Sequence, residues 1–105
     1  MDYLELVQQG DVLFKEVRSF PEGLTKSKAT VFAEGEVTGH AHRPSSVQDV
    51  DFYEDSEGIL WCETKKEVEV THEEHGAVKV KPGKYEIGIV REVDPFEDAV
   101  RQVAD

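Results

Sequence analysis

All four histidines of the chain fall in two short segments, and histidine is the commonest metal ligand among protein side chains. His40 and His42 lie in one segment, and His72 and His75 lie in the other. Residues i and i+2 of a β-strand point to the same side, so His40 and His42 would present two imidazoles from one rigid element. The spacing therefore predicts a polar site that is built from histidines.

The second pair follows the clearest alternation of the chain, which runs through residues 67–72. In an extended strand Val68, Val70 and His72 would share one side. If the two valines face the interior, His72 does too. Residues 73–76 are predicted to form a turn that brings His75 back towards His72.

A site that combines both pairs would have the chemistry of a divalent transition-metal centre. Three or four neutral imidazoles can bind Zn²⁺, Ni²⁺, Fe²⁺ or Mn²⁺, and Glu36, Glu73 or Glu74 could add a carboxylate. Two histidines and a carboxylate would leave open positions on the metal, whereas three histidines would suit a zinc-bound water. The predicted ligands are His40, His42 and His72, with His75 or Glu73 as the fourth.

Two other interpretations of the histidines remain open at this stage. They could line a polar ligand pocket without a metal, or they could only form hydrogen bonds in and around loops. If the site is catalytic, we expect metal-assisted chemistry on a small molecule, with Glu74 as the general base.

The elements that would position these residues are short strands. Turn-forming residues recur along the chain, and runs rich in Val, Ile, Phe and Tyr lie between them. Residues 50–53 and 59–63, for example, are predicted to form a hairpin. This pattern predicts one mainly β domain over residues 1–105, either a barrel or a sandwich. Residues 94–103 carry the signals of a short C-terminal helix, with a final strand as the alternative.

The charge of the chain excludes two classes of partner. Lys and Arg number 12 against 23 Asp and Glu, which gives a formal net charge of −11. A binder of nucleic acid or of an anionic membrane would need a basic patch. The lone cysteine, Cys62, lies in an apolar run and is predicted to be a small core residue. The N-terminal segment lacks the pattern of a signal peptide, so we expect a cytoplasmic location.

The chain resembles a family of small uncharacterised microbial and phage-associated proteins. The resemblance is carried by Gly10–Val12, Ala33–His42, Thr71–His75, Pro82–Ile87 and Arg91–Pro95, and so it covers most of the sequence. It implies that the two histidine segments belong together, and it implies no activity.

A looser resemblance connects the first histidine pair to the cupins, which are small β-barrels that hold a metal by His-x-His, a carboxylate and a later histidine. It implies that His40 and His42 are metal ligands. The match fails at two places. Ser46 and Val47 stand where cupins have the glutamate, and no histidine follows the turn at residues 82–83.

A hypothesis from a different class is a non-enzymatic interaction module. Its acidic surface or an open sheet edge would bind a protein partner, and the histidines would be structural or would tune the interface with pH. Open sheet edges also allow a homodimer.

Overall fold

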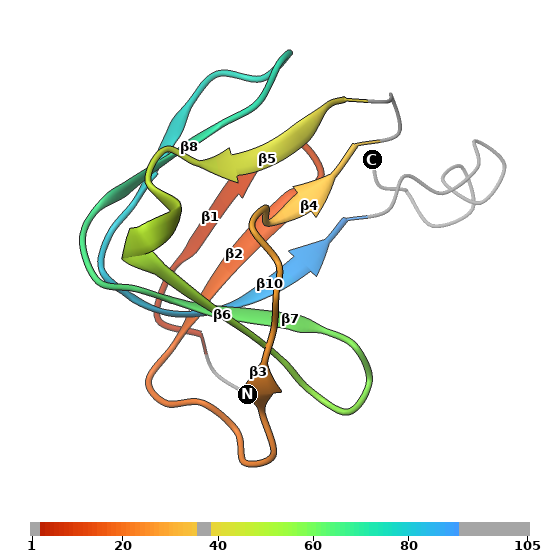
Figure 1. Ribbon diagram of the computed structural model, residues 1–105. Helices are drawn as coiled ribbons and strands as arrows, with labels where there is room; N and C mark the ends of the chain where they lie inside the picture. The colour runs from red at the N-terminus through yellow and green to blue at the C-terminus, as the bar shows by residue number, and fades with distance from the viewer. Residues whose placement is uncertain (1–2, 36–38, 91–105) are drawn as a thin grey trace, which may run out of the picture.

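The computed structural model describes residues 3–35 and 39–90, which form short strands and one 3-10 turn (Figure 1). The strands are β1 (Leu6–Gln9), β2 (Val12–Val17), β3 (Thr25–Lys26), β4 (Ala33–Glu34), β5 (Ala41–Pro44), β6 (Val50–Glu54), β7 (Leu60–Thr64), β8 (Val68–Thr71), β9 (Val78–Val80) and β10 (Gly83–Ile89). The 3-10 turn, η1 (Val47–Asp49), leads into β6.

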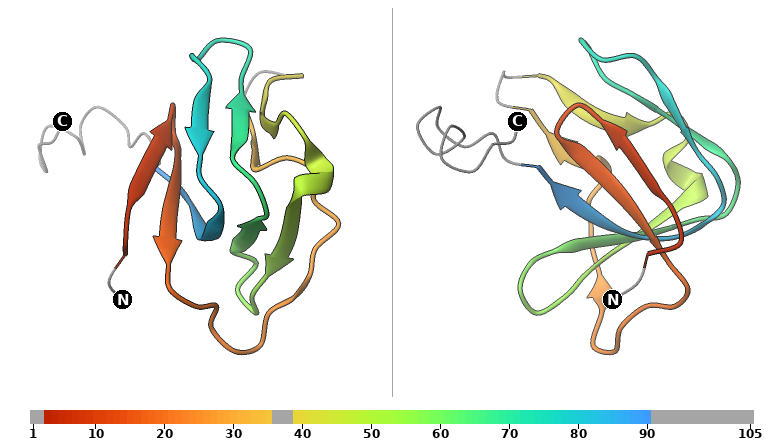
Figure 2. Two further views of the ribbon diagram at one scale, coloured as in Figure 1. Left: turned by 90° about the vertical axis from the view of Figure 1, so that its left-hand side faces the viewer. Right: turned by 180° about the vertical axis from the view of Figure 1, so that it is seen from behind.

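The strands form two antiparallel sheets (Figure 2). The first has the order β1-β2-β10-β7-β6-β3, and the second has the order β4-β5-β8-β9. The mainly β fold is confirmed, and of the two predicted architectures the described residues form the sandwich. The predicted hairpin is also confirmed, since β6 pairs with β7 from Val50↔Thr64 to Glu54↔Leu60.

Both sheets contribute to one apolar core. Along β2 and β8 alternate residues are buried, because the side chains of a strand point alternately to its two sides. Phe32 joins the layers by contacting Phe14 and Phe52, at ring-centroid distances of 4.9 and 5.4 Å. The buried residues that form this core cluster are Val12, Phe14, Phe32, Val50, Phe52, Cys62, Val68, Val70, Val80, Tyr85 and Ile87.

Cys62 is fully buried, as predicted for a small core residue. Burial, followed by the charge of Glu63, raises the pKa of its thiol to about 12. A thiol of this kind stays protonated near neutral pH and is a poor nucleophile.

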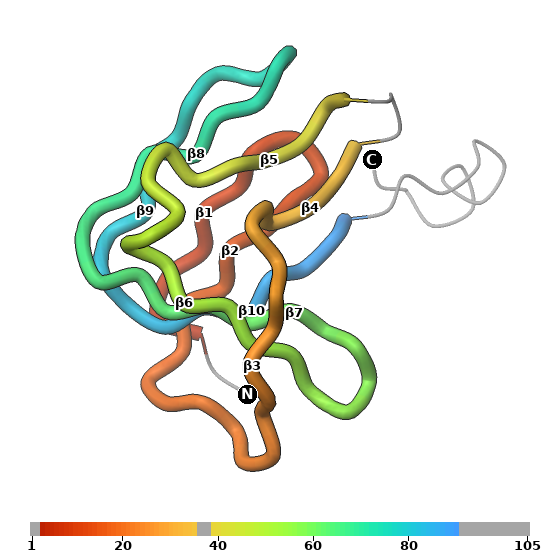
Figure 3. Tube along the Cα trace, in the orientation of Figure 1, coloured from red at the N-terminus to blue at the C-terminus, as the bar shows by residue number. Residues whose placement is uncertain are grey.

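Three connections bring the predicted site residues together at one end of the sandwich (Figure 3). They are the β1–β2 turn at residues 10–11, the segment that enters β5, and the β8–β9 loop at residues 72–77. The antiparallel pairing of β5 with β8, with Arg43 opposite Thr71, places the start of β5 beside the end of β8. The two histidine segments are therefore neighbours.

Two predictions fall on residues outside the described ranges. They are the helix at residues 94–103 and the carboxylate of Glu36. Within residues 3–35 and 39–90, no helix is long and apolar enough to cross a membrane. The prediction of one domain over residues 1–105 stays a prediction.

Candidate metal centre

His42 is the buried centre of the histidine cluster. It lies on β5 with a relative exposure of 1%, and its ring is held by the side chain of Gln9 at the end of β1. The Gln9 amide donates to the carbonyl oxygens of Val70 (2.9 Å) and Gly76 (2.8 Å). Gln9 thereby ties β1 to β8 and to the β8–β9 loop, and its remaining oxygen accepts from His42.

This network assigns the tautomer of the neutral His42 ring. Gln9 Oε1 lies 2.8 Å from His42 Nδ1, and an amide oxygen can only accept. The proton is therefore on Nδ1, and Nε2 keeps its lone pair. A hydrogen bond of this kind commonly orients a metal-binding histidine.

The free nitrogen of His42 faces a carboxylate. Nε2 lies 3.4 Å from Asp11 Oδ1, and the Asp11 side chain is 59% exposed. Burial, the largest cause, and the neighbouring His72 lower the pKa of His42, although Asp11 acts in the opposite direction. When the His42 ring is neutral, its Nε2 lone pair and the Asp11 carboxylate oxygen therefore face each other as two electron-pair donors.

The rings of His72 and His75 pack next to that of His42. The ring centroids of His42 and His72 are 4.3 Å apart, and those of His72 and His75 are 4.6 Å apart. The predicted return of His75 towards His72 is confirmed. His75 also lies against Gly10, where an added Cβ would come within 2.5 Å of the His75 ring. A larger residue at this place would displace the His75 ring, and the φ of +57° favours glycine as well.

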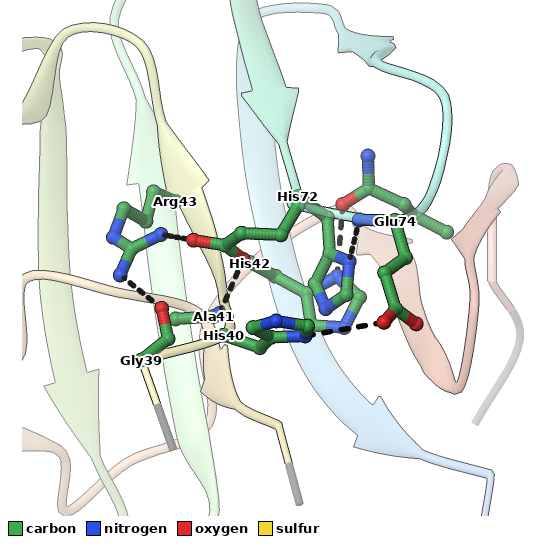
Figure 4. Close-up of polar contacts among 9 residues, drawn as sticks. Gly39, His40, Ala41, His42, Arg43, His72 and Glu74 are labelled. Carbon is green, nitrogen blue, oxygen red and sulfur yellow. Dashed lines mark hydrogen bonds and ion pairs between the residues drawn. The ribbon is translucent and has the colours of Figure 1, made fainter. Parts of the chain in front are cut away.

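The tautomer of neutral His72 is the opposite of that of His42. The backbone N–H of Glu74 donates to His72 Nδ1 at 3.0 Å, so the ring proton is on Nε2 (Figure 4). Ligation of a metal through Nε2 would require the proton to move to Nδ1 and this turn hydrogen bond to open. Ligation through Nδ1 would displace the Glu74 N–H.

His40 completes the cluster on its solvent side. Its ring meets the ring of His72 edge to face, at a centroid distance of 5.7 Å. Its Nδ1 lies 3.7 Å from Glu74 Oε2, and the Glu74 side chain is 65% exposed (Figure 4). The rings of His40 and His42 thus both lie next to that of His72. The prediction that both come from one strand is wrong for His40, because β5 begins at Ala41.

Glu73 joins the two histidine segments. Its carboxylate accepts from the backbone N–H of Ala41 at 3.0 Å and forms an ion pair with Arg43. Arg43 also donates to the carbonyl oxygen of Gly39 at 3.0 Å. The Arg43 hydrogen bond, followed by that from Ala41, lowers the pKa of Glu73 to about 2. Glu73 is therefore ionised at neutral pH.

Among the described residues, one group has ligand atoms that all lie within 4.8 Å of one another. It consists of His40, His72 and Glu73. The sequence predicted a set centred on His40, His42 and His72, with Glu73 or His75 as the fourth member. The structure brings all five side chains into one cluster, but their action as ligands stays a prediction.

Sequence reasoning missed three members of the site. Gln9 and Asp11 lie on either side of Gly10, and Arg43 follows His42. Glutamine is rarely buried, and a buried glutamine at a strand end needs hydrogen-bond partners. Nothing in the local sequence, however, indicates that this partner is a histidine 33 residues later.

Comparison with known proteins gives one match. The family model described as Domain of unknown function (DUF8820) matches residues 8–90, which include both histidine segments and the β1–β2 turn. Searches of curated proteins and of solved structures find no match.

Proposed function

We propose that this chain, which belongs to the family described as Domain of unknown function (DUF8820), is a metal-binding β-sandwich protein. The ion would be a divalent transition metal held by His40, His72 and Glu73. The observation that carries this proposal is the approach of their ligand atoms to within 4.8 Å of one another. These atoms come from two segments of the sequence, with His40 lying 32 residues before His72 and 33 before Glu73.

The donor chemistry supports a transition metal over calcium or magnesium. Two imidazoles and one carboxylate suit zinc, iron, manganese or nickel, whereas calcium and magnesium prefer oxygen ligands. The carboxylate is already ionised, because Arg43 and the Ala41 N–H stabilise its charge. Glu74 lies beside His40 Nδ1 and would orient that ring so that its other nitrogen is available.

A three-ligand site leaves coordination positions for water or a small molecule. The site lies at the end of the sandwich, where Glu74 and His75 are exposed, so a small molecule could reach it. We propose metal-assisted chemistry on such a molecule, with Glu74 as the general base. We also propose that the metal site is loosely similar to that of the cupins and that the protein is located in the cytoplasm.

The test is metal analysis of the untagged protein purified without chelator. We expect about one or more equivalents of zinc, iron, manganese or nickel per chain, and a loss of about one equivalent in His40→Ala/His72→Ala. His42 is left unchanged in this variant, because its removal would leave buried Gln9 Oε1 without its hydrogen bond, at a cost of about 1–3 kcal/mol. His75→Ala tests the remaining predicted histidine ligand, and Glu57→Gln, which changes an exposed residue of the β6–β7 turn, is the control.

Equal metal content in the wild type and the double variant would rule out His40 and His72 as ligands. A protein that binds no metal even after reconstitution would favour the rival hypothesis of an interaction module. Pull-down of a protein partner, together with an unchanged melting temperature in the presence of metals, would then support that rival.

A further inference from the structure

We propose that His42 and Asp11 form a second cation-binding position, separate from the group of His40, His72 and Glu73. Its ligand atoms are His42 Nε2 and Asp11 Oδ1, and Gln9 is the residue that positions the His42 ring. The ion is a divalent transition metal whose remaining ligands are water. This position does not depend on the first one, so either assignment can fail alone.

The spacing of the two atoms fits a shared ion. They lie 3.4 Å apart. Two ligands bonded to one zinc ion at about 2.0–2.1 Å with a tetrahedral angle would be separated by about 3.3 Å. A direct hydrogen bond between an imidazolium and a carboxylate is shorter, at about 2.7–2.9 Å.

The lone pair of His42 is also fixed in direction. His42 Nδ1 is bonded to Gln9 Oε1 at 2.8 Å, and both hydrogens of that amide are donated to backbone carbonyls. The ring therefore cannot turn without breaking a buried network. With the proton on Nδ1, the buried Nε2 has no hydrogen to donate to Asp11. A cation between His42 Nε2 and Asp11 Oδ1 would accept an electron pair from each of them.

The surroundings favour entry of a cation. The His42 side chain is 2% exposed, but Asp11 is 59% exposed in the β1–β2 turn, so an ion can approach from the solvent side. The net charge of −11 raises the local concentration of cations around the chain.

The experiment is a titration of metal-free protein with Zn²⁺, followed by calorimetry and native mass spectrometry. We expect two equivalents for the wild type, one for Asp11→Asn and one for His40→Ala/His72→Ala. Asp11→Asn keeps the shape of an exposed turn residue, and Glu57→Gln removes an acidic charge from the β6–β7 turn as the matched control. Nitrogen NMR of the histidine rings supplies a second readout, in which zinc should shift His42 Nε2 and this shift should disappear in Asp11→Asn.

The outcomes separate the two assignments. One equivalent in the wild type that Asp11→Asn leaves unchanged, with no shift at His42 Nε2, would overturn the second position and leave the first intact. One equivalent that is lost in Asp11→Asn but kept in His40→Ala/His72→Ala would support the second position and overturn the first. No uptake of zinc by the wild type would overturn both.

Discussion

At the scale of single residues, the site depends on which ring nitrogen carries the proton. His42 Nδ1 faces an acceptor, the oxygen of Gln9, whereas His72 Nδ1 faces a donor, the N–H of Glu74. Two neighbouring rings 4.3 Å apart are therefore held in opposite neutral tautomers. Of these two rings, His42 is the one whose Nε2 lone pair is free before any metal arrives.

These tautomers can be measured directly. In metal-free protein with both rings neutral, we expect the proton on Nδ1 of His42 and on Nε2 of His72, because Nδ1 of His42 faces an acceptor and Nδ1 of His72 faces a donor. Long-range nitrogen–proton NMR distinguishes the two forms. Gln9→Met removes the acceptor and should release the preference of His42 but leave that of His72. The same tautomer at both rings in the wild type would contradict this assignment.

At the scale of elements, the Glu73 carboxylate joins the β8–β9 loop to the start of β5. It contacts the Ala41 N–H and the Arg43 guanidinium, both of which belong to β5. Its pKa of about 2 lies below the ordinary value of 4.5. A depressed carboxyl pKa contributes stability above the ordinary value, and this contribution is lost as the pH falls towards the folded value.

We therefore expect Glu73→Gln to lower the free energy of unfolding at pH 7, measured by urea denaturation of chelator-treated protein. The difference from the wild type should shrink as the pH falls from about 4.5 towards about 2, because the wild-type carboxylate then takes up its proton. Glu67→Gln, which removes an exposed carboxylate just before β8, is the control and should show no comparable pH-dependent difference. A Glu73→Gln effect of constant size across this range would contradict the proposed link.

The elements also show how far sequence reasoning reaches. The alternation of residues 67–72 correctly places Val68 and Val70 in the core, because a strand has a strict period of two. β8 ends at Thr71, however, so His72 follows the strand and is half-buried. The two histidine pairs lie close together because β5 pairs with β8. The order of strands in an antiparallel sheet cannot be predicted from the local periodicity of the sequence. Asp11 and Gln9 could not be assigned for the same reason, since their contacts to His42 cross from one sheet to the other.

At the scale of the whole molecule, the site is a junction between the two sheets. Gln9 and Asp11 belong to the first sheet and its β1–β2 turn, whereas His42 and Glu73 belong to the second sheet and its loop. An ion held at this junction binds the folded chain but not the unfolded one. Metal binding should therefore stabilise the fold as a whole.

At a free Zn²⁺ concentration of 100 times its Kd, one bound ion adds about 2.7 kcal/mol of stability, which for a chain of this size raises the melting temperature by roughly 10–20 °C. A chain with a net charge of −11 is also stabilised by any cation that screens its repulsion, so Mg²⁺ at the same concentration is the necessary control. Because screening does not depend on imidazoles, we expect Zn²⁺ to exceed Mg²⁺ in the wild type. The excess should decrease in His40→Ala/His72→Ala, and it should also decrease as the pH falls through the histidine range, since protons compete for the ligands. Equal shifts with both ions, measured by calorimetric melting, would show that acidity alone accounts for the effect and would refute a transition-metal site.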